Sequence, residues 1–398
     1  MSTLSRITMA LKTAACPELW RMSPRQWRAL ARIFRATRPS SAPSATLLTI
    51  FCPPVGSTAF RRHMAGLSQI ARGDYVPLVA HIAVTDRCPF SCRRCSNIPT
   101  GAEPDFVVLA SVLHQLEAAG TANIAFTGGE PLLREDLPDL VAACRPTISP
   151  ILFTTGWSLT DSVAARLRSS GLTAAFVSLD HYEPDPHNCI RGRDAFDTAV
   201  RAIGLFRDHG IHVAAQAVAT RDLLIDDTLN RFLGFCRSLK VDEVMLLEHV
   251  AVPGRCETCD PLDDEHHRLL HQLHRRSAAS RSLPKIETMS FLEGPDFLGC
   301  QAGFCFLYIT TVGEVYPCDF VPLCLGNVFD TGLPIILERL KSSFPRPARS
   351  CLALDLQQML PVPTSLPLDW AAAQPILAKR DPGPVPPLMR ALLRMEDD

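Results

Sequence analysis

Residues 79–95 read Val-Ala-His-Ile-Ala-Val-Thr-Asp-Arg-Cys-Pro-Phe-Ser-Cys-Arg-Arg-Cys, an apolar run followed at once by three cysteines. Cys88, Cys92 and Cys95 have the spacing C-x3-C-x2-C. Three thiolates on one loop can hold three irons of a [4Fe-4S] cluster and leave the fourth iron open to another ligand. The stretch therefore predicts a redox-active metal site directly after a buried strand.

Zinc is the alternative metal for such a triplet. Cysteines two residues apart commonly bind zinc, and His81 or His63 could supply a fourth ligand. Closed zinc sites normally contain two C-x2-C pairs, whereas the first gap here is three residues wide and no second pair lies nearby. The spacing favours iron and sulfur and leaves zinc open as an alternative.

A pattern of strand followed by helix begins at residue 79. Six short apolar runs are expected to be strands, near residues 79–85, 124–127, 150–155, 174–179, 212–219 and 243–250. Helical stretches separate them, for example over 107–119, 159–170 and 194–208. Apolar runs without alternation indicate a parallel sheet covered by helices. Six units are fewer than the eight of a complete barrel, so the sequence predicts a partial (β/α)6 barrel resembling a TIM barrel.

The organisation of the chain outside the barrel follows from changes in composition. Two helical stretches, 24–38 and 58–71, precede the barrel, and the first has an apolar side suited to packing on the main domain. We expect four segments: an N-terminal helical extension over 1–75, the barrel over 76–255, a small cysteine-rich domain over 256–360 and a proline-rich tail over 361–398.

Composition argues against several classes of function. Forty basic and 41 acidic residues give a formal net charge of −1. The protein as a whole therefore has no strong electrostatic field that would attract nucleic acid. No apolar run approaches the ~18 residues of a membrane span, so we expect no transmembrane segment. Fifteen cysteines without a recognisable secretory signal suit metal clusters in a reducing cytoplasm.

Unusual residues follow the next strands as well. Parallel α/β folds bind ligands at the carboxyl ends of their strands. Gly128, Gly129 and Glu130 follow the second strand, where two glycines allow the backbone to approach a ligand closely. The candidates near later strand ends are Thr155, Ser178, Asp180 and Arg191. Each alone could serve as a cap or surface residue, but together they predict a ligand pocket.

In order and spacing, these motifs resemble those of the radical S-adenosylmethionine (SAM) enzymes over residues 79 to 355. The resemblance implies that the open iron of the Cys88, Cys92 and Cys95 cluster binds SAM. It also implies that the Gly128-Gly129-Glu130-Pro131 segment meets the SAM amino group. Thr155 occupies a position where asparagine is more usual in the family. Ser178 and Asp180 would form hydrogen bonds with SAM carboxylate and ribose groups. The planar guanidinium group of Arg191 would bind the carboxylate through two parallel hydrogen bonds.

The C-terminal cysteines resemble a second family motif. Cys300, Gly313 and Cys318 match the C-x9–15-G-x4-C opening of SPASM and twitch domains, in which a hairpin presents thiolates to an auxiliary cluster. The later cysteines of a full SPASM domain are missing, which implies a twitch or truncated SPASM extension with one auxiliary [4Fe-4S] cluster. Its implied ligands are Cys300, Cys318, Cys324 and Cys351, and Cys305 is the reserve ligand if one of these does not bind the cluster. Cys256 and Cys259 stay unassigned.

The resemblance implies an enzyme of the oxidoreductase type. Such an enzyme cleaves SAM reductively to a 5′-deoxyadenosyl radical and oxidises or cross-links a substrate, here most often a peptide or protein, with a flavodoxin- or ferredoxin-type electron donor. A small-molecule radical SAM oxidoreductase and a non-catalytic zinc or electron-transfer protein are the alternatives. Asp319, directly after Cys318, stands where sulfatase-maturing relatives place an acid that takes a proton from the substrate. Glu248 and His249 are the other candidates for that role.

Overall fold

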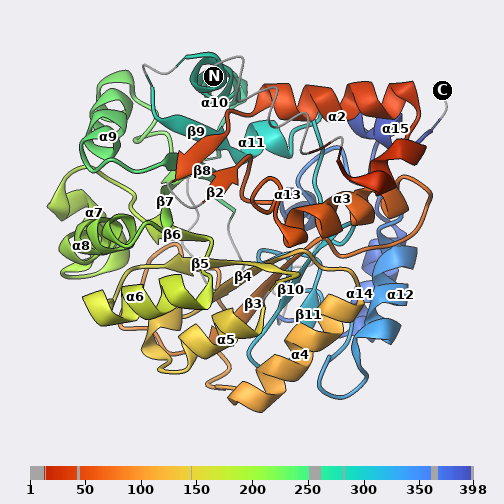
Figure 1. Cartoon of the computed structure of the whole chain (residues 1–398), viewed down its shortest axis with the longest axis horizontal. Helices are drawn as coiled ribbons and strands as arrows, with labels where there is room; N and C mark the ends of the chain where they lie inside the picture. The colour runs from red at the N-terminus through yellow and green to blue at the C-terminus, as the bar shows by residue number, and fades with distance from the viewer. Residues whose placement is uncertain are drawn as a thin grey trace.

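The apolar runs pair side by side in chain order as parallel strands (Figure 1). The computed structural model describes residues 13, 15–42, 45–144, 146–250, 261–280, 283–359 and 366–395, so Cys256 and Cys259 lie outside the described residues. The six predicted strands are β3 (Val79–Thr85), β4 (Asn123–Gly128), β5 (Ser149–Thr154), β6 (Ala174–Ser178), β7 (His212–Ala219) and β8 (Glu243–Glu248). Their residues are largely buried on both faces, which explains why the sequence shows no polar alternation.

Three further strands extend this sheet. They are β9 (Lys285–Thr288), β10 (Phe306–Ile309) and β11 (Val315–Tyr316). β9 pairs parallel with β8, β10 pairs parallel with the other edge of β3, and β11 returns antiparallel to β10. The predicted fold class, a parallel α/β sheet of the partial-barrel type, is confirmed. The C-terminal hairpin, expected in a small domain, is hydrogen-bonded into the barrel sheet, with Tyr308 opposite His81.

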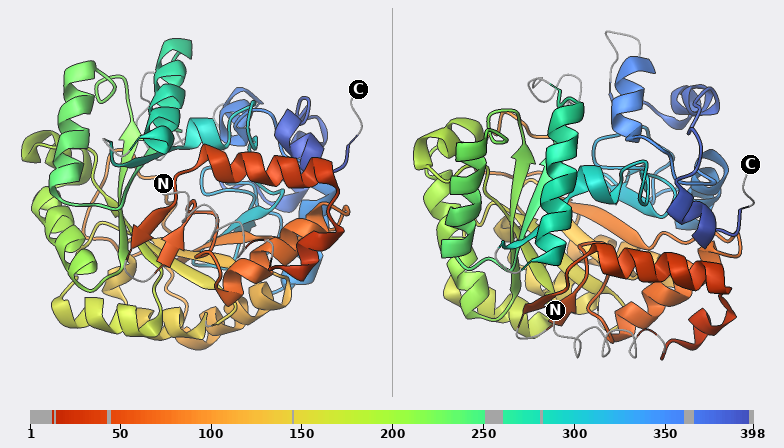
Figure 2. Two further views of the ribbon diagram at one scale, coloured as in Figure 1. Left: turned by 45° about the horizontal axis from the view of Figure 1, so that its top comes forward. Right: turned by 90° about the horizontal axis from the view of Figure 1, so that it is seen from above.

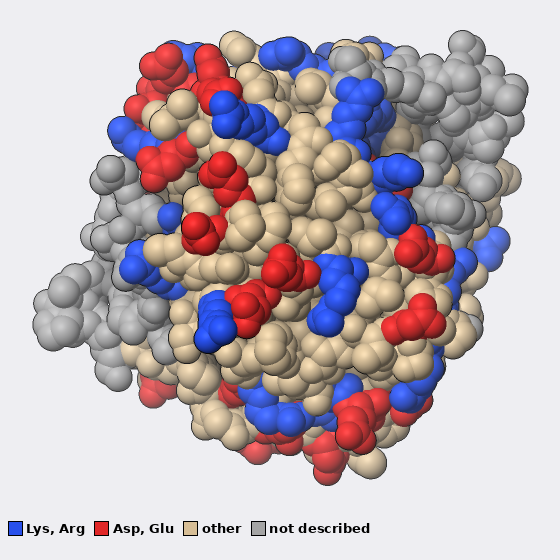
Figure 3. All heavy atoms as spheres, turned by 90° about the vertical axis from the view of Figure 1, so that its left-hand side faces the viewer, with Lys and Arg blue, Asp and Glu red and all other residues tan. Residues whose placement is uncertain are grey.

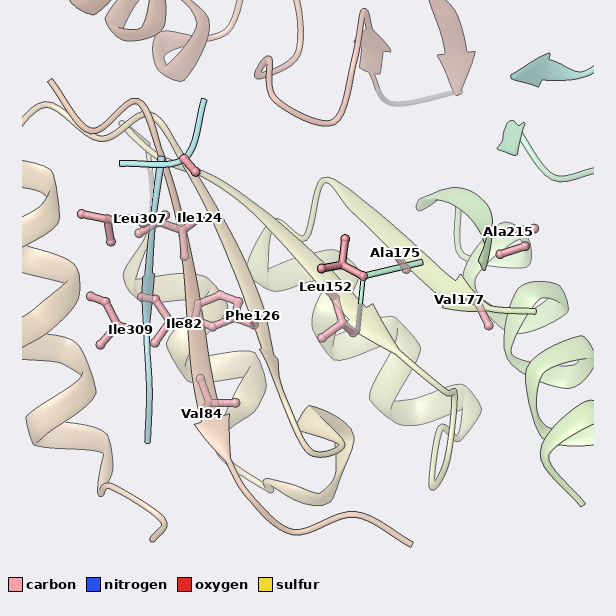
Figure 4. Close-up of a cluster of buried hydrophobic side chains, with 14 of the residues drawn as sticks. Ile82, Val84, Ile124, Phe126, Leu152, Ala175, Val177, Ala215, Leu307 and Ile309 are labelled. Carbon is pink, nitrogen blue, oxygen red and sulfur yellow. The ribbon is translucent and has the colours of Figure 1, made fainter. Parts of the chain in front are cut away.

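Helices between the strands cover the outer face of the sheet (Figures 1 and 2). They are α4 (Phe106–Ala118), α5 (Leu137–Ala143), α6 (Asp161–Ser170), α8 (Ala195–Asp208), α9 (Asp226–Ser238) and α10 (Asp264–Ala279). Asp105 caps α4 by accepting a hydrogen bond from the Val108 N–H at 2.9 Å. Between sheet and helices lies the main core, to which Ile82, Phe126 and Leu152 belong (Figure 4).

Segments near the two ends of the chain pack together on one flank of the barrel. The predicted N-terminal helices are α2 (Pro24–Ala36) and α3 (Thr58–Ile70), and a capping box between Ser23 and Gln26 starts α2. α2 lies beside α15 (Pro387–Leu392), where the Gln26 side chain donates to the Leu392 carbonyl at 2.8 Å (Figures 1 and 2). Residues of both termini share a hydrophobic cluster with β3 and β10, so they support the barrel from outside.

The remaining elements are short or peripheral. They are η1 (Pro17–Arg21), β1 (Ser40–Ala42), β2 (Ala45–Leu47), η2 (Pro131–Leu133), α7 (Pro184–Arg191), α11 (Met289–Leu292), α12 (Leu333–Ser343), α13 (Leu352–Met359) and α14 (Trp370–Ala378). On the face that Figure 3 shows, acidic and basic side chains are interspersed. No helix in the described ranges has the length and apolar character needed to cross a membrane.

The loop after β2 fills the inside of the barrel at the amino ends of its strands. Leu47 and Ile50 pack against Ile151, Ala174 and Phe176, which belong to an interior cluster separate from the main core. The Asn123 side chain, at the start of β4, donates to the Ile50 carbonyl. Because this loop occupies the amino ends, a ligand cavity is left toward the carboxyl ends.

A buried ion cluster ties β8 to β9 beneath that cavity. Lys285 Nζ lies 2.7 Å from a Glu243 carboxylate oxygen and 2.9 Å from Glu287 Oε1, and all three side chains are almost completely buried. Burial and the charge of Glu243 raise the pKa of Glu287 to about 8, so Glu287 keeps its proton near neutrality. Lys285 therefore balances the charge of Glu243.

Replacing Lys285 by methionine should destabilise the fold strongly. The variant leaves the Glu243 carboxylate buried without its cation, which costs about 3–5 kcal/mol for a broken buried pair. Urea unfolding of Lys285→Met should show this loss, whereas Lys341→Met, at an exposed position of α12, should stay within about 0.5 kcal/mol of the parent. Equal stability of the two variants would contradict the role given to Lys285.

Candidate active site

One cavity of about 930 Å³ holds most of the predicted site residues. It extends over the carboxyl ends of the strands and along the inner side of β3 and β10. The predicted residues that line it are Cys88, Cys92, Cys95, Gly128, Gly129, Thr155, Ser178, Arg191, Cys300, Cys318, Asp319 and Cys351. Glu130, Asp180, Cys324 and Cys305 are not among its lining residues. The structure therefore brings two separate groups of three cysteines to the same cavity.

The first cysteine group lies on a loop that contacts the turn Gly128-Gly129-Glu130-Pro131, the GGEP turn. The Gly129 N–H donates to the Thr85 carbonyl at 2.7 Å, and the Glu130 N–H donates to the Arg87 carbonyl at 2.8 Å. A Cβ atom on Gly129 would lie 2.2 Å from the Arg87 oxygen, closer than real Cβ contacts. The glycine is therefore required for the packing of two loops, a reason that differs from the ligand approach expected from sequence.

The Glu130 carboxylate forms hydrogen bonds with other groups of the protein. Its carboxylate accepts hydrogen bonds from Thr154 Oγ1 at 2.6 Å and from the Thr155 N–H at 2.7 Å, as well as from the Thr155 hydroxyl. Burial raises its pKa although these bonds favour the charged form. Glu130 thereby fixes the end of β5 and with it the cavity-lining Thr155.

Asp180 likewise acts through a neighbour. Burial would raise its pKa, but the Arg191 guanidinium at 2.6 Å and the Val218 N–H at 3.0 Å outweigh burial and lower it. The Asp180 N–H donates to Nδ1 of His187, whose pKa burial lowers to about 4, so this imidazole is neutral near neutrality. Asp180 thus orients Arg191, which lines the cavity, as does Ser178.

The second cysteine group is assembled by the strands beside β3. Cys300 precedes β10 and Cys318 follows the antiparallel β11, so both lie toward the amino end of β10. The Gly303 N–H donates to the Pro317 carbonyl at 2.9 Å, which joins the two segments. Reciprocal backbone hydrogen bonds between Cys300 and Ala348 bring Cys351 alongside, and the nearby Cys351 thiol raises the pKa of Cys300 well above its usual range.

Both cysteine groups suit iron–sulfur clusters. Burial raises the pKa of Cys88 to about 11, and burial together with neighbouring acidic groups raises that of Cys318. Thiolates in such places need a nearby cation, which the irons of a cluster provide. In the described part of the chain, no three His, Cys, Asp or Glu side chains converge as around a single metal ion. Cluster thiolates stand farther apart because each binds its own iron.

Cys324 is not brought to the other three C-terminal cysteines. Its N–H donates to the Leu368 carbonyl at 2.7 Å, and its side chain packs with Ala83, Tyr308 and Tyr316. Cys305 lies within the flank cluster, and its thiol donates to the Gln301 side-chain oxygen at 3.1 Å. The ligand set implied by the sequence resemblance is thus divided in the structure.

Asp319 is paired with a residue that the sequence interpretation considered only as a zinc ligand. His81 Nδ1 lies 3.0 and 3.1 Å from the two Asp319 carboxylate oxygens. The imidazole packs against the rings of Phe153 and Phe306, while its buried Nε2 has no hydrogen-bond partner. A histidine on a strand gives no signal of its own, because only parallel pairing of β10 with β3 brings Asp319 within reach.

Glu248 and Glu293 are among the further acidic side chains that line the cavity. Glu248, considered above as a proton acceptor, bonds His267 at 3.0 Å, and His249 beside it is not a lining residue. Glu293, in the loop after α11, lines the cavity and was not singled out in the sequence because it precedes the cysteine motif. Burial raises its pKa well above the usual range, with contributions from Cys300 and Asp319.

Comparison with known families agrees with this geometry. The radical SAM superfamily matches residues 82–239, and the SPASM iron–sulfur cluster-binding domain matches residues 300–351. A GTP 3',8-cyclase of Yersinia pestis is 35% identical over 167 residues, 39% of this chain and 50% of that protein. An AdoMet-dependent heme synthase of Nitratidesulfovibrio vulgaris is 25% identical over 285 residues, 64% of this chain and 77% of the relative. The chain thus spans only half the length of the first of these relatives.

Solved structures share the fold at low sequence identity. Streptococcus suis SuiB bound to the precursor peptide SuiA has a TM-score of 0.57 and 19% identity, covering 70% of this chain and 68% of SuiB. Native anSMEcpe with bound AdoMet has a TM-score of 0.53 and 19% identity, and the match covers 65% of this chain and 80% of anSMEcpe.

The partial barrel, with a cysteine triplet after its first core strand, defines an iron–sulfur enzyme that binds SAM. The chain belongs to the radical SAM superfamily and carries a C-terminal SPASM-type iron–sulfur domain. The predicted cofactors, a SAM-binding [4Fe-4S] cluster, SAM and an auxiliary cluster, are confirmed at the level of these domains. The assignment of individual ligands and SAM-binding residues stays a prediction.

Gly129→Ala should impair the first cluster site, because the new Cβ would push the Arg87 carbonyl and the cysteine loop apart. With Cys300, Cys318 and Cys351 replaced, iron bound after anoxic reconstitution reports on the first site alone and should fall by more than half. Gly204→Ala is the matched control, since nothing lies within 4 Å of its Cβ position. Full iron occupancy in Gly129→Ala would show that the close approach is not required.

Proposed function

We propose that this protein cleaves SAM reductively and uses the resulting radical to oxidise or cross-link a peptide or protein side chain. The observation that carries the proposal is that the two cysteine groups line one cavity, so a substrate placed there faces both. When bound, the SAM cluster would supply the electron that cleaves SAM to methionine and the 5′-deoxyadenosyl radical, and the auxiliary cluster would supply an acceptor for the substrate electron. Oxidation therefore fits this arrangement better than isomerisation.

Several residues are proposed to bind SAM. Arg191, held by Asp180, would present guanidinium N–H groups to the SAM carboxylate, and Ser178 and Thr155 line the same part of the cavity. Gly128 and Gly129 expose backbone at the mouth of the cysteine loop. Glu130 and Asp180 are proposed to position these residues because their carboxylates are engaged within the protein.

A peptide substrate is supported by the size of the cavity and by the fold. About 930 Å³ lies near the upper end of ordinary ligand pockets. Two solved structures with this fold contain peptides, SuiA in SuiB and the Cp18Cys peptide in anSMEcpe. A small-molecule substrate is the second candidate, because the names of curated relatives describe a GTP 3',8-cyclase and a heme synthase.

Asp319 and His81 are proposed to remove the substrate proton. Asp319 lines the cavity and would take the proton, while His81, bonded to its carboxylate through Nδ1, holds that carboxylate in place. Carboxylate and imidazole together form a base that is oriented before substrate arrives. A flavodoxin- or ferredoxin-type donor would supply the electron for SAM cleavage, and we propose a cytoplasmic location, where such donors and reduced thiols occur.

Anoxic incubation with SAM and dithionite tests the proposed activity before any substrate is known. We expect the reconstituted protein to bind about eight irons, the sum of two four-iron clusters, and to form 5′-deoxyadenosine. Replacing Cys88, Cys92 and Cys95 together by alanine should leave about four irons and abolish SAM cleavage. Stoichiometric zinc in place of iron, with no SAM cleavage, would contradict the proposal. Peptide and small-molecule pools added to the active enzyme then separate the two substrate classes.

Asp319→Asn should separate radical formation from product formation. With a substrate found in that assay, the variant should keep both clusters and form 5′-deoxyadenosine while product falls at least tenfold, because the carboxylate that accepts the proton is lost. His81→Gln should give the same pattern, and the double variant should be no worse than the singles if both act as one unit. Normal product formation in Asp319→Asn would assign it a structural role and return attention to Glu248 and His249.

A further inference from the structure

The loop that carries the first cysteine group is long and irregular. The chain forms no helix or strand between Thr85 and Phe106, a stretch that the structure describes throughout. Loops of this length without secondary structure are uncommon in compact domains. Side chains on such a loop keep one arrangement only if neighbouring groups hold the loop in place. The contacts at its two ends therefore decide how the three thiols are arranged.

Asp86, directly after β3, joins the two ends of this loop. Its Oδ2 atom accepts hydrogen bonds from the Thr100 N–H at 2.7 Å, the Thr100 hydroxyl at 2.8 Å and the Gly101 N–H at 3.2 Å. The Asn97 side chain donates to Oδ1 at 3.4 Å. All three cysteines of the group lie between Asp86 and Asn97 in the chain. One carboxylate thus closes the loop that contains them.

The same carboxylate is bonded to the auxiliary domain. The Thr311 hydroxyl donates to Asp86 Oδ2 at 2.9 Å and lies 3.1 Å from the Thr100 hydroxyl. Thr311 is buried in the turn between β10 and β11, and Cys318 follows β11. The tip of the hairpin that leads to Cys318 is therefore hydrogen-bonded to the loop of the other cysteine group.

The pairing of β10 with β3 explains how these distant residues meet. Ile309, the last residue of β10, pairs with Ile82 in parallel register. Both strands continue in the same direction, which brings the turn after Ile309 to the loop that follows β3. Hydrogen bonds to a charged acceptor are stronger than those between neutral groups, and several on one carboxylate fix it firmly. Asp86 is therefore a firm connection between the two segments.

We propose that Asp86 is a positioning residue for SAM binding, which fixes the cysteine loop against the auxiliary hairpin and holds its three thiols in the arrangement that SAM binding needs. This proposal rests on the proposed function, because it assumes that the cysteine loop holds the SAM-binding cluster. Asp86 lines the cavity, whereas Thr311 does not. Thr311 would therefore influence SAM binding through Asp86, so that the auxiliary hairpin contributes to the SAM site.

The test measures SAM affinity in the full, anoxically reconstituted protein. Electron paramagnetic resonance spectra of the dithionite-reduced protein are recorded during titration with SAM, and their SAM-dependent change gives the Kd. Thr311→Val removes one hydroxyl and should weaken SAM binding about fivefold, the scale of one lost hydrogen bond. Thr311→Ser keeps a hydroxyl and should match the parent. Asp86→Asn removes the charge that several donors share and should weaken SAM binding by more than about tenfold.

Two controls separate positioning from a general effect. The Thr331 hydroxyl, at an exposed position of the same domain, donates to the Asn327 carbonyl at 2.8 Å, and Thr331→Val should match the parent. The double variant Asp86→Asn with Thr311→Val should bind SAM no more weakly than Asp86→Asn alone, because both changes act on one contact. Iron content of about eight in each variant shows that weaker SAM binding does not result from a lost cluster.

Several results would overturn the proposal. Parent-like SAM binding in Thr311→Val would do so, and if Asp86→Asn alone bound SAM weakly, Asp86 would contact SAM directly. A loss in Thr331→Val equal to that in Thr311→Val, or a double variant weaker than Asp86→Asn, would show that Thr311 does not act through Asp86. A parent protein that holds its clusters but does not bind SAM would contradict the proposed function itself, a failure that is visible before any variant is made.

Discussion

Strand β3 is hydrogen-bonded along both edges, and the rest of the site depends on that pairing. On one side it pairs with β4, whose GGEP turn holds the cysteine loop that leaves β3. On the other side it pairs with β10, which arrives from far along the chain. One buried strand thus carries the first cysteine group at its carboxyl end and brings Cys300, Cys318 and Asp319 to its inner face. Without the second pairing, the cavity would contain one metal site.

The polar and charged residues of the site are organised in two layers. Arg191, Thr155 and His81 line the cavity. Each of them is held by a carboxylate, from Asp180, Glu130 and Asp319 respectively, at hydrogen-bond distance. Buried carboxylates that accept several hydrogen bonds fix the side chains they contact. The order of the cavity wall is therefore decided by residues that, for the most part, do not touch a ligand.

Much of the fold could be predicted from the sequence because each unit is encoded locally. The apolar runs of β3 to β8 and the intervening helices follow from periodicity, and the first cysteine group follows from spacing alone. The pairing of β10 with β3 could not be predicted, since short apolar segments do not specify partners distant in sequence. The role of His81 depends on that pairing, and so does the separation of Cys324 from the other cysteines. The sequence also could not show that Arg191 faces the cavity whereas Asp180 holds the Arg191 side chain in place.

The most direct test of this account is the position of iron in crystals of the anoxically reconstituted protein. Anomalous diffraction at the iron edge should show two peaks on the wall of one cavity, the first beside Cys88, Cys92 and Cys95 and the second beside Cys300, Cys318 and Cys351. A single peak, or a second peak at Cys324 away from the cavity, would contradict the claim that both clusters face one substrate space.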